Sequence, residues 1–163
     1  LNVLRNKHIP SNYIYNTREV RLNLLAGLLD TDGWYEPNSK SFGFSQCESR
    51  KYIAEDVLFI ARSLGMKASI RLKKCKKTGV CKNSNVENQY VVKILSGCEE
   101  IPTLIRRKQA HGDKTWQRHI NRTMFKIEPY KVDEYYGFGV DKDHLFLLKD
   151  FTIVHNSAAF NQF

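Results

Sequence analysis

The stretch LLAGLLDTDG, residues 24–33, combines a leucine-rich helical pattern with a pair of small residues and ends in two acids and a glycine. Upstream, Thr17 is placed to cap the N-terminus of this helix. The pattern therefore predicts a helix over about 18–31, with Gly33 at its C-terminal cap. Gly27 in the helix interior costs about 1 kcal/mol relative to alanine, and close packing against a second helix would justify it.

The two acids of this stretch, Asp30 and Asp32, lie at the C-terminal end of the predicted helix. The helix dipole disfavours carboxylates there, so their placement is explained if a bound metal ion supplies positive charge. A simpler interpretation also fits, in which Asp30 binds nearby backbone and Asp32 forms a turn with the following glycine. The local pattern leaves both interpretations open.

The residues after this helix predict a hairpin and a second helix. WYE (34–36) and SFGFSQC (41–47) flank the turn-forming stretch PNSK, which is typical of two strands joined by a turn. The apolar periodicity of residues 49–65 then predicts a helix that opens at Ser49 and closes at Gly65.

Two further strands and a third helix complete the predicted order. KASIRLK (67–73) alternates between polar and apolar residues, and QYVVKILSG (89–97) is a second strand. EEIPTLIRRK (99–108) predicts a helix entered through Pro102. The predicted fold class is α+β, in the order helix, two strands, helix, two strands, helix.

The chain is strongly basic, with 26 Lys and Arg against 17 Asp and Glu and a sequence pI near 9.4. Residues 67–108 hold eleven basic and three acidic side chains, whereas residues 128–150 hold six acidic and three basic ones. The first segment favours a polyanionic partner, of which nucleic acid is the leading candidate. The change of sign indicates a boundary near residues 125–130. No apolar run approaches the roughly 20 residues of a membrane span.

LAGLLDTDG (25–33) resembles the LAGLIDADG signature of homing endonucleases at all but two of nine positions. KHIP (7–10) and ARSLGMKASI (61–70) resemble the flanking blocks of the second endonuclease repeat in inteins. The resemblance implies an αββαββα repeat whose signature helix packs against that of a pseudo-symmetric half, each half delivering one acid to a shared site. By this resemblance Asp32 is the metal ligand and Asp30 is structural.

The resemblance also implies a double-stranded DNA substrate. A Mg²⁺ ion held by Asp32 and its counterpart would activate a water and stabilise the charge on the phosphodiester being cut. Three basic residues on predicted strands are candidates for phosphate or base contact: Arg71, Lys73 and Lys93. Lys108 resembles a basic residue that assists catalysis in these enzymes. Arg107 fits the same position and is also a DNA-binding candidate.

The tail YYGFGVDKDHLFLLKDFTIVHN (135–156) resembles the C-terminal splicing blocks of inteins, whose last residue is typically Asn preceded by His. YYGFGV, HLFLL and FTIV are short β runs separated by polar turns. They are implied to be strands of an all-β Hint-type splicing domain. SAAFNQF (157–163) is then the start of the host protein.

The resemblance assigns a role to each polar residue at this junction. The Asn156 side-chain amide attacks its own main-chain carbonyl, closes a succinimide and releases Ser157. His155 polarises that carbonyl or protonates the leaving amine, and His144 assists by proton transfer. Ser157 is the nucleophile of the preceding transesterification. Gly137 stands where many inteins carry an acid or a cysteine, so that accessory role is unassigned.

The resemblance implies three segments: an endonuclease repeat over 1–125, the end of a splicing domain over 126–156, and host sequence over 157–163. The sequence shows no first signature helix and no N-terminal splice nucleophile, so we expect the C-terminal part of a larger intein. Its partners would be DNA, the N-terminal half of the same intein and host segments, with no membrane. Splicing would need no cofactor. Two alternatives are a homodimeric single-motif endonuclease and a DNA-binding module of the same fold that lacks catalysis.

Overall fold

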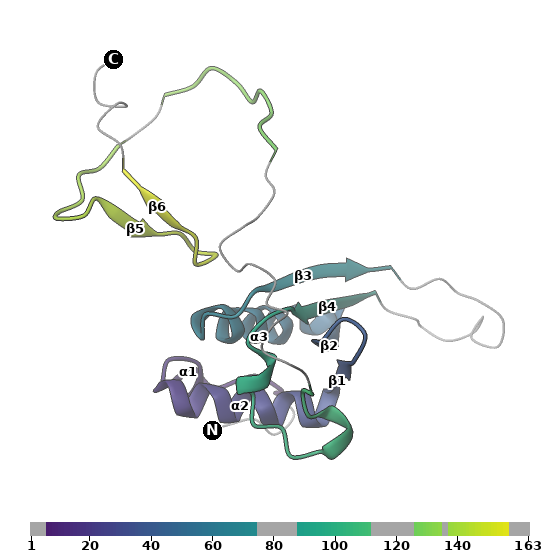
Figure 1. Ribbon diagram of the computed structural model, residues 1–163. Helices are drawn as coiled ribbons and strands as arrows, with labels where there is room; N and C mark the ends of the chain where they lie inside the picture. Colours follow the sequence, from purple (N-terminus) through teal and green to yellow (C-terminus); the bar gives the residue numbers. More distant parts are fainter. Residues whose placement is uncertain (1–5, 75–87, 112–125, 135–136, 157–163) are drawn as a thin grey trace. The chain divides into compact units, whose positions relative to one another are not determined.

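The computed structural model describes residues 6–74, 88–111, 126–134 and 137–156 (Figure 1). The chain divides into two compact units, Leu1–Ile120 and Asn121–Phe163. The first unit holds a mixed α+β fold and the second holds a two-stranded sheet. Within the described ranges, no helix is long and apolar enough to cross a membrane.

The first unit begins with a single helical turn, α1 (Ser11–Ile14), which is followed by α2 (Arg18–Asp32). The Thr17 hydroxyl accepts a hydrogen bond from the Val20 amide at 3.4 Å, which confirms the predicted cap. The helix predicted over residues 18–31 is confirmed and is one residue longer.

Gly33 was predicted as a helix cap, but in the structure it allows a close approach between strand and helix. It follows α2 directly and opens β1 (Gly33–Glu36), with an extended backbone at φ −97° and ψ 177° rather than a left-handed cap conformation. A Cβ at this position would lie 2.7 Å from the Leu29 Cα atom. The start of the strand therefore approaches the last helical turn too closely for any side chain.

Four strands form one antiparallel sheet in the order β1-β2-β4-β3 (Figure 1). The strands after β1 are β2 (Ser41–Cys47), β3 (Ala68–Lys73) and β4 (Gln89–Ile94). They confirm the predicted hairpin around residues 37–40 and the two later strands. Because β4 pairs with both β2 and β3, it joins the two halves of the sheet.

The second long helix, α3 (Lys51–Ser63), follows a 3-10 turn, η1 (Glu48–Arg50). Ser49 lies in that turn and does not cap α3, contrary to the prediction. Gly65 ends the helix region as predicted, in a left-handed conformation with φ of 82°.

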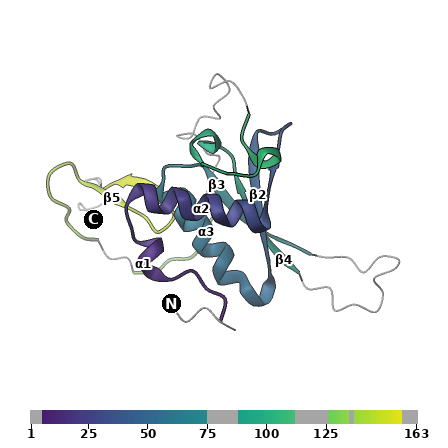
Figure 2. The same ribbon diagram turned by 90° about the horizontal axis from the view of Figure 1, so that it is seen from below.

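Both long helices pack on one face of the sheet, where the main hydrophobic core lies (Figure 2). Strand side chains alternate between faces, so alternate residues of β2 and β4 enter this core. The fully buried members of the core come from α2, β2, α3 and β4: Leu25, Leu29, Phe42, Phe44, Ala54, Val57, Ile60, Ala61, Val92 and Ile94. The opposite face of the sheet carries no helix among the described residues.

The third helix predicted over 99–108 is wrong. This segment holds two 3-10 turns, η3 (Cys98–Glu100) and η4 (Arg106–Lys108), separated by extended backbone. Ile101 has a ψ of 114°, in line with the steric restriction that a following proline imposes.

A contact from a distant part of the chain also opposes the third helix. The Asp30 carboxylate accepts hydrogen bonds from the backbone amides of Leu104 at 2.8 Å and Ile105 at 3.2 Å. These amides are thereby satisfied without a helix. Local sequence patterns contain no signal for a partner more than 70 residues away.

The second unit contains one described hairpin, β5 (Leu145–Leu147) with β6 (Ile153–His155). Its strands are the central parts of the predicted runs HLFLL and FTIV. Residues 137–140 of the run YYGFGV form no strand, and residues 135–136 lie outside the described residues. The structure thus contains two of the expected strands, and the Hint-type domain stays a prediction.

Candidate active site

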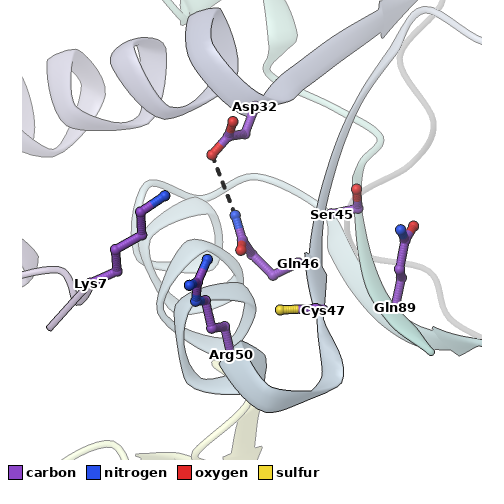
Figure 3. A pocket seen from close by; sticks show the side chains of 7 residues that line it. All are labelled: Lys7, Asp32, Ser45, Gln46, Cys47, Arg50 and Gln89. Atoms are coloured by element: carbon purple, nitrogen blue, oxygen red, sulfur yellow. Dashed lines mark hydrogen bonds between the residues drawn. The ribbon is translucent and has the colours of Figure 1, made fainter. Parts of the chain in front are cut away.

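A polar hollow of about 300 Å³ lies where α2 ends beside the ends of β2 and β4 (Figure 3). Seven residues line it: Lys7, Asp32, Ser45, Gln46, Cys47, Arg50 and Gln89. One is an acid and two are bases, and the others, a cysteine among them, are uncharged. This is the place where an exposed carboxylate and two cations converge.

Asp32 is the last residue of α2, and its exposed side chain enters the hollow. The Gln46 amide donates to Asp32 Oδ2 at 3.4 Å, a long hydrogen bond that orients the carboxylate toward β2 (Figure 3). Gln46 reaches it because side chains alternate along β2 and this one lies on the same face as the core residues Phe42 and Phe44.

Lys7 and Arg50 bring positive charge to the same hollow (Figure 3). Lys7 precedes α1 in the chain, and Arg50 ends the 3-10 turn before α3. Both side chains extend toward the Asp32–Gln46 pair. Such an arrangement suits a ligand that carries both phosphate oxygens and a bound divalent cation.

The donor chemistry of the hollow fits Mg²⁺. Asp32 supplies a carboxylate, and Gln46 beside it can add an amide oxygen, and oxygen atoms are the ligands that hard cations prefer. Within the described part of the chain, no three His, Cys, Asp or Glu side chains gather into a metal-binding group.

The two acids of the signature stretch differ in their surroundings. Asp30 is half-buried and clamps the backbone amides of Leu104 and Ile105, whereas Asp32 is exposed on the hollow. The structure therefore agrees with a structural role for Asp30. It leaves the carboxylate of Asp32 accessible to a ligand.

Lys108 lies at the same end of α2 but points at the backbone. Its ammonium donates to the carbonyl oxygens of Leu29 at 2.9 Å and Asp30 at 2.7 Å, and its side chain is buried. The charge thus caps the C-terminus of α2, where the helix dipole favours a cation. Arg107 beside it is exposed. The catalytic role predicted for Lys108 stays a prediction.

Three of the four predicted DNA-contacting residues share the helix-free face of the sheet. The strand register places Lys93 opposite Ser69, and Arg71 opposite Val91. Because the neighbours Val92 and Ile94 point into the core, Lys93, Arg71 and Lys73 point away from it. Arg107 lies in η4, outside the sheet.

In the second unit, the structure brings together three of the predicted splicing residues. The Asn156 backbone amide donates to the His144 carbonyl at 2.7 Å, and the rings of His144 and His155 lie 5.9 Å apart. The Asn156 side-chain amide donates to the Phe138 carbonyl. The hairpin therefore holds the two imidazoles near one another and ties the backbone of Asn156 to that of His144. Ser157 lies outside the described residues.

A family model described as homing endonuclease matches residues 8–115, about two thirds of the chain. This chain belongs to the homing endonuclease family. Membership supports DNA binding and a DNA endonuclease function for the matched residues. The mixed α+β architecture with its antiparallel sheet is consistent with a homing endonuclease domain.

The homing endonuclease chain is also similar to a protein named replicative DNA helicase DnaB from Mycobacterium intracellulare, at 28% identity over 164 residues. The alignment covers 97% of this chain and 27% of the helicase. The chain thus spans about a quarter of the length of the relative that it matches.

Sequence reasoning did not assign Gln46, Arg50 or Lys7 to the endonuclease site. Gln46 had one usable signal, because strand alternation pairs it with Phe42 and Phe44 on the helix side of β2. Lys7 lies within KHIP (7–10), but no local sequence pattern indicates that these residues lie near the end of α2. Arg50 is one of many basic residues, and only the fold places it beside Asp32.

Proposed function

We propose that this chain is the C-terminal part of an intein, in which the second half of a LAGLIDADG homing endonuclease precedes the end of a protein-splicing domain. The observation that carries the nuclease assignment is the exposed Asp32 carboxylate, which shares a polar hollow with Gln46 and two cations. The proposed segments are 1–125, 126–156 and 157–163, an arrangement similar to the yeast vacuolar ATPase intein.

In the proposed nuclease, each residue of the hollow has one task. Asp32 and an acid from the missing half hold Mg²⁺, which when bound supplies a Lewis acid and an activated water. Lys7 and Arg50 bind the non-bridging oxygens of the scissile phosphate. Gln46 holds the Asp32 carboxylate in its orientation through their 3.4 Å hydrogen bond.

The outer face of α2 supports the pairing of two halves. Gly27 is exposed, and a Cβ there would meet no atom within 4 Å, whereas its neighbour Ala26 is buried in the core of this unit. A second helix can therefore approach the α2 backbone closely at Gly27. A second copy of this chain would fit the same face, so the homodimeric alternative also requires a small residue at position 27.

The hairpin of the second unit supports the splicing proposal. Nδ2 of Asn156 attacks the main-chain carbonyl carbon of Asn156, the peptide bond to Ser157 breaks, and the leaving nitrogen takes up a proton. In this proposal His155 and His144 carry the proton that Nδ2 loses to the leaving nitrogen, a role supported by the hydrogen bond between the Asn156 amide and the His144 carbonyl and by the 5.9 Å between the two rings. The hydrogen bond from Asn156 Nδ2 to the Phe138 carbonyl restrains the amide before it attacks.

The comparison with the helicase supports an inserted segment. Nearly all of this chain aligns with about a quarter of a longer protein. This is the relation expected if the segment interrupts a host, with SAAFNQF (157–163) as resumed host sequence.

The nuclease proposal is tested by charge-neutral replacement of the two acids. With the missing half supplied, Asp32→Asn should lower Mg²⁺-dependent cleavage of target DNA by about 100-fold or more, because a metal ligand is lost. Asp30→Asn should instead lower the melting temperature, since its carboxylate holds two backbone amides. Glu19→Gln, an exposed position in the first turn of α2, serves as the control. Cleavage by Asp32→Asn at the parent rate would contradict the proposal.

A further inference from the structure

One transverse row of residues on the helix-free face has an unusual composition. Trp34 on β1 pairs with Gly43 on β2, which pairs with Lys93 on β4. A Cβ at Gly43 would lie 2.3 Å from the Trp34 indole, so the ring lies directly over this glycine. The Lys93 ammonium lies 5.2 Å from the centre of the same ring, within the range of a cation–π contact.

Glu36, two residues after Trp34, completes the group. Its carboxylate accepts from the Lys93 ammonium at 2.7 Å and from the Ser39 hydroxyl at 2.9 Å. The hydrogen bond from Lys93, followed by that from Ser39, lowers the pKa of Glu36 below its usual value. The carboxylate is therefore ionised at neutral pH, and it is the one acid in the four strands of this sheet.

Lys93 is restrained in a way that Arg71 and Lys73 are not. The side chain of Lys93 is only 18% exposed, and its charge is matched by Glu36. Arg71 and Lys73 are exposed on β3, and no ion pair among the described residues includes either of them. The same face thus presents two available cations and one that an internal carboxylate occupies.

We propose that Glu36 is a specificity-determining residue of this face, because it occupies Lys93 in place of a DNA phosphate and so excludes that lysine from non-specific binding. Only a DNA site that displaces the carboxylate gains the Lys93 contact. The inference rests on DNA binding by the helix-free face, which belongs to the proposed function. It adds a repulsive element, of the kind that distinguishes specific from general affinity.

The test measures binding of the full chain to a mixed-sequence DNA duplex over a range of salt concentrations. Each phosphate neutralised by a cation steepens the plot of log affinity against log salt by about 0.9. Glu36→Gln should therefore bind this duplex more tightly than the parent at low salt, with a slope steeper by about 0.9. The double variant Glu36→Gln with Lys93→Met should return to the parent slope.

The chain offers a matched control on the helix side. Glu55 pairs with Lys51 at 2.8 Å, and Lys51 lies 5.5 Å from the centre of the Tyr90 ring. Glu55→Gln changes the net charge equally and breaks a similar pair, so it should leave the slope at the parent value. Thermal unfolding verifies that each variant is folded.

The outcomes distinguish the role of Glu36 from DNA binding by the helix-free face. A steep parent slope that Glu36→Gln leaves unchanged, or that Glu55→Gln shifts equally, overturns the role of Glu36 alone. A parent chain whose affinity does not depend on salt overturns both this role and DNA binding by the helix-free face.

Discussion

Lys108 shows how a single residue connects two distant parts of the chain. Its buried ammonium donates to carbonyls in the last turn of α2, while the carboxylate of Asp30, in that same turn, accepts from the backbone amides of residues 104–105. The segment after β4 and the end of α2 are thus held together from both sides. Asp32 is presented from a helix end that these contacts stabilise.

Replacement of Lys108 by methionine should therefore destabilise the fold. Lys108→Met keeps the length of the side chain but leaves the Leu29 and Asp30 carbonyls without this donor. The Leu29 carbonyl keeps its hydrogen bond from the Gly33 amide, whereas the Asp30 carbonyl loses the Lys108 ammonium. An unsatisfied buried acceptor costs about 1–3 kcal/mol, so we expect the free energy of unfolding to fall by about that amount. Urea denaturation followed by circular dichroism measures the change.

Arg107→Met is the adjacent control, because Arg107 is exposed. It should change the free energy of unfolding by no more than about 0.5 kcal/mol. Equal effects of the two substitutions would contradict the capping role of Lys108. DNA cleavage by both variants at a temperature where each is folded would then test which residue, if either, assists catalysis.

Among the elements, α2 has two faces with different surroundings. Its inner face enters the core through Leu25 and Leu29, and its outer face is open at Gly27. The two glycines of the signature stretch are needed for different reasons. Gly27 has empty space beside it, whereas Gly33 has none.

Alanine at these two positions should have opposite effects. Gly27→Ala should stabilise this chain by about 0.5–1 kcal/mol, because alanine favours a helix and its methyl group meets no atom. Gly33→Ala should destabilise it, because a Cβ would lie 2.7 Å from Leu29. Melting temperatures of the two variants show the sign of each change.

The same Gly27 position tests the pairing of the two halves. Gly27→Leu should leave this chain folded and yet impair cleavage when the missing half is supplied, since the larger side chain holds the second helix away. Full cleavage by that variant would show that α2 does not take part in pairing of the two halves. Analytical ultracentrifugation of the parent chain alone would show whether a second copy takes this place.

The elements that the sequence predicted well are those whose signals are local. Thr17 and the leucine periodicity defined α2, and alternation with turn residues defined the strands. The third helix failed because Asp30, far away in the chain, takes the backbone amides of residues 104–105. Of the residues that line the hollow, only Asp32 was predicted as a site residue. Strand alternation gives the face of Gln46 but not its contact with Asp32, and only the tertiary fold brings Arg50 and Lys7 there.

At the scale of the whole molecule, two units of different charge and architecture follow one another along the chain. The first carries the basic sheet face and the hollow, and the second carries the hairpin with Asn156 at its end. The family match ends at residue 115, before the second unit begins. The two proposed activities can therefore be removed separately.

Asn156→Ala should abolish release of the tail when the N-terminal splicing half is supplied, because no side-chain amide remains to close the succinimide. His155→Ala and His144→Ala should slow release, since proton transfer contributes typically about 10²- to 10⁴-fold. Mass spectrometry of the released fragments, with DNA cleavage as a parallel readout, follows both activities.

Ser157→Ala separates ligation from cleavage, because it should block ligation while C-terminal cleavage continues. Asn38→Ala, in the turn between β1 and β2, is a control that should leave release at the parent rate. If Asn156→Ala released the tail as fast as the parent, the splicing assignment would be wrong.

The direct passage from α2 into β1 has an optical consequence. No loop separates α2, which ends at Asp32, from β1, which begins at Gly33. Trp34 is the second residue of β1, and its ring lies over Gly43 beside Lys93. A tilt of α2 on meeting its partner, or the arrival of DNA on the sheet, would therefore change the environment of this indole. With Trp116 replaced by phenylalanine, intrinsic fluorescence from Trp34 becomes a built-in reporter of both events.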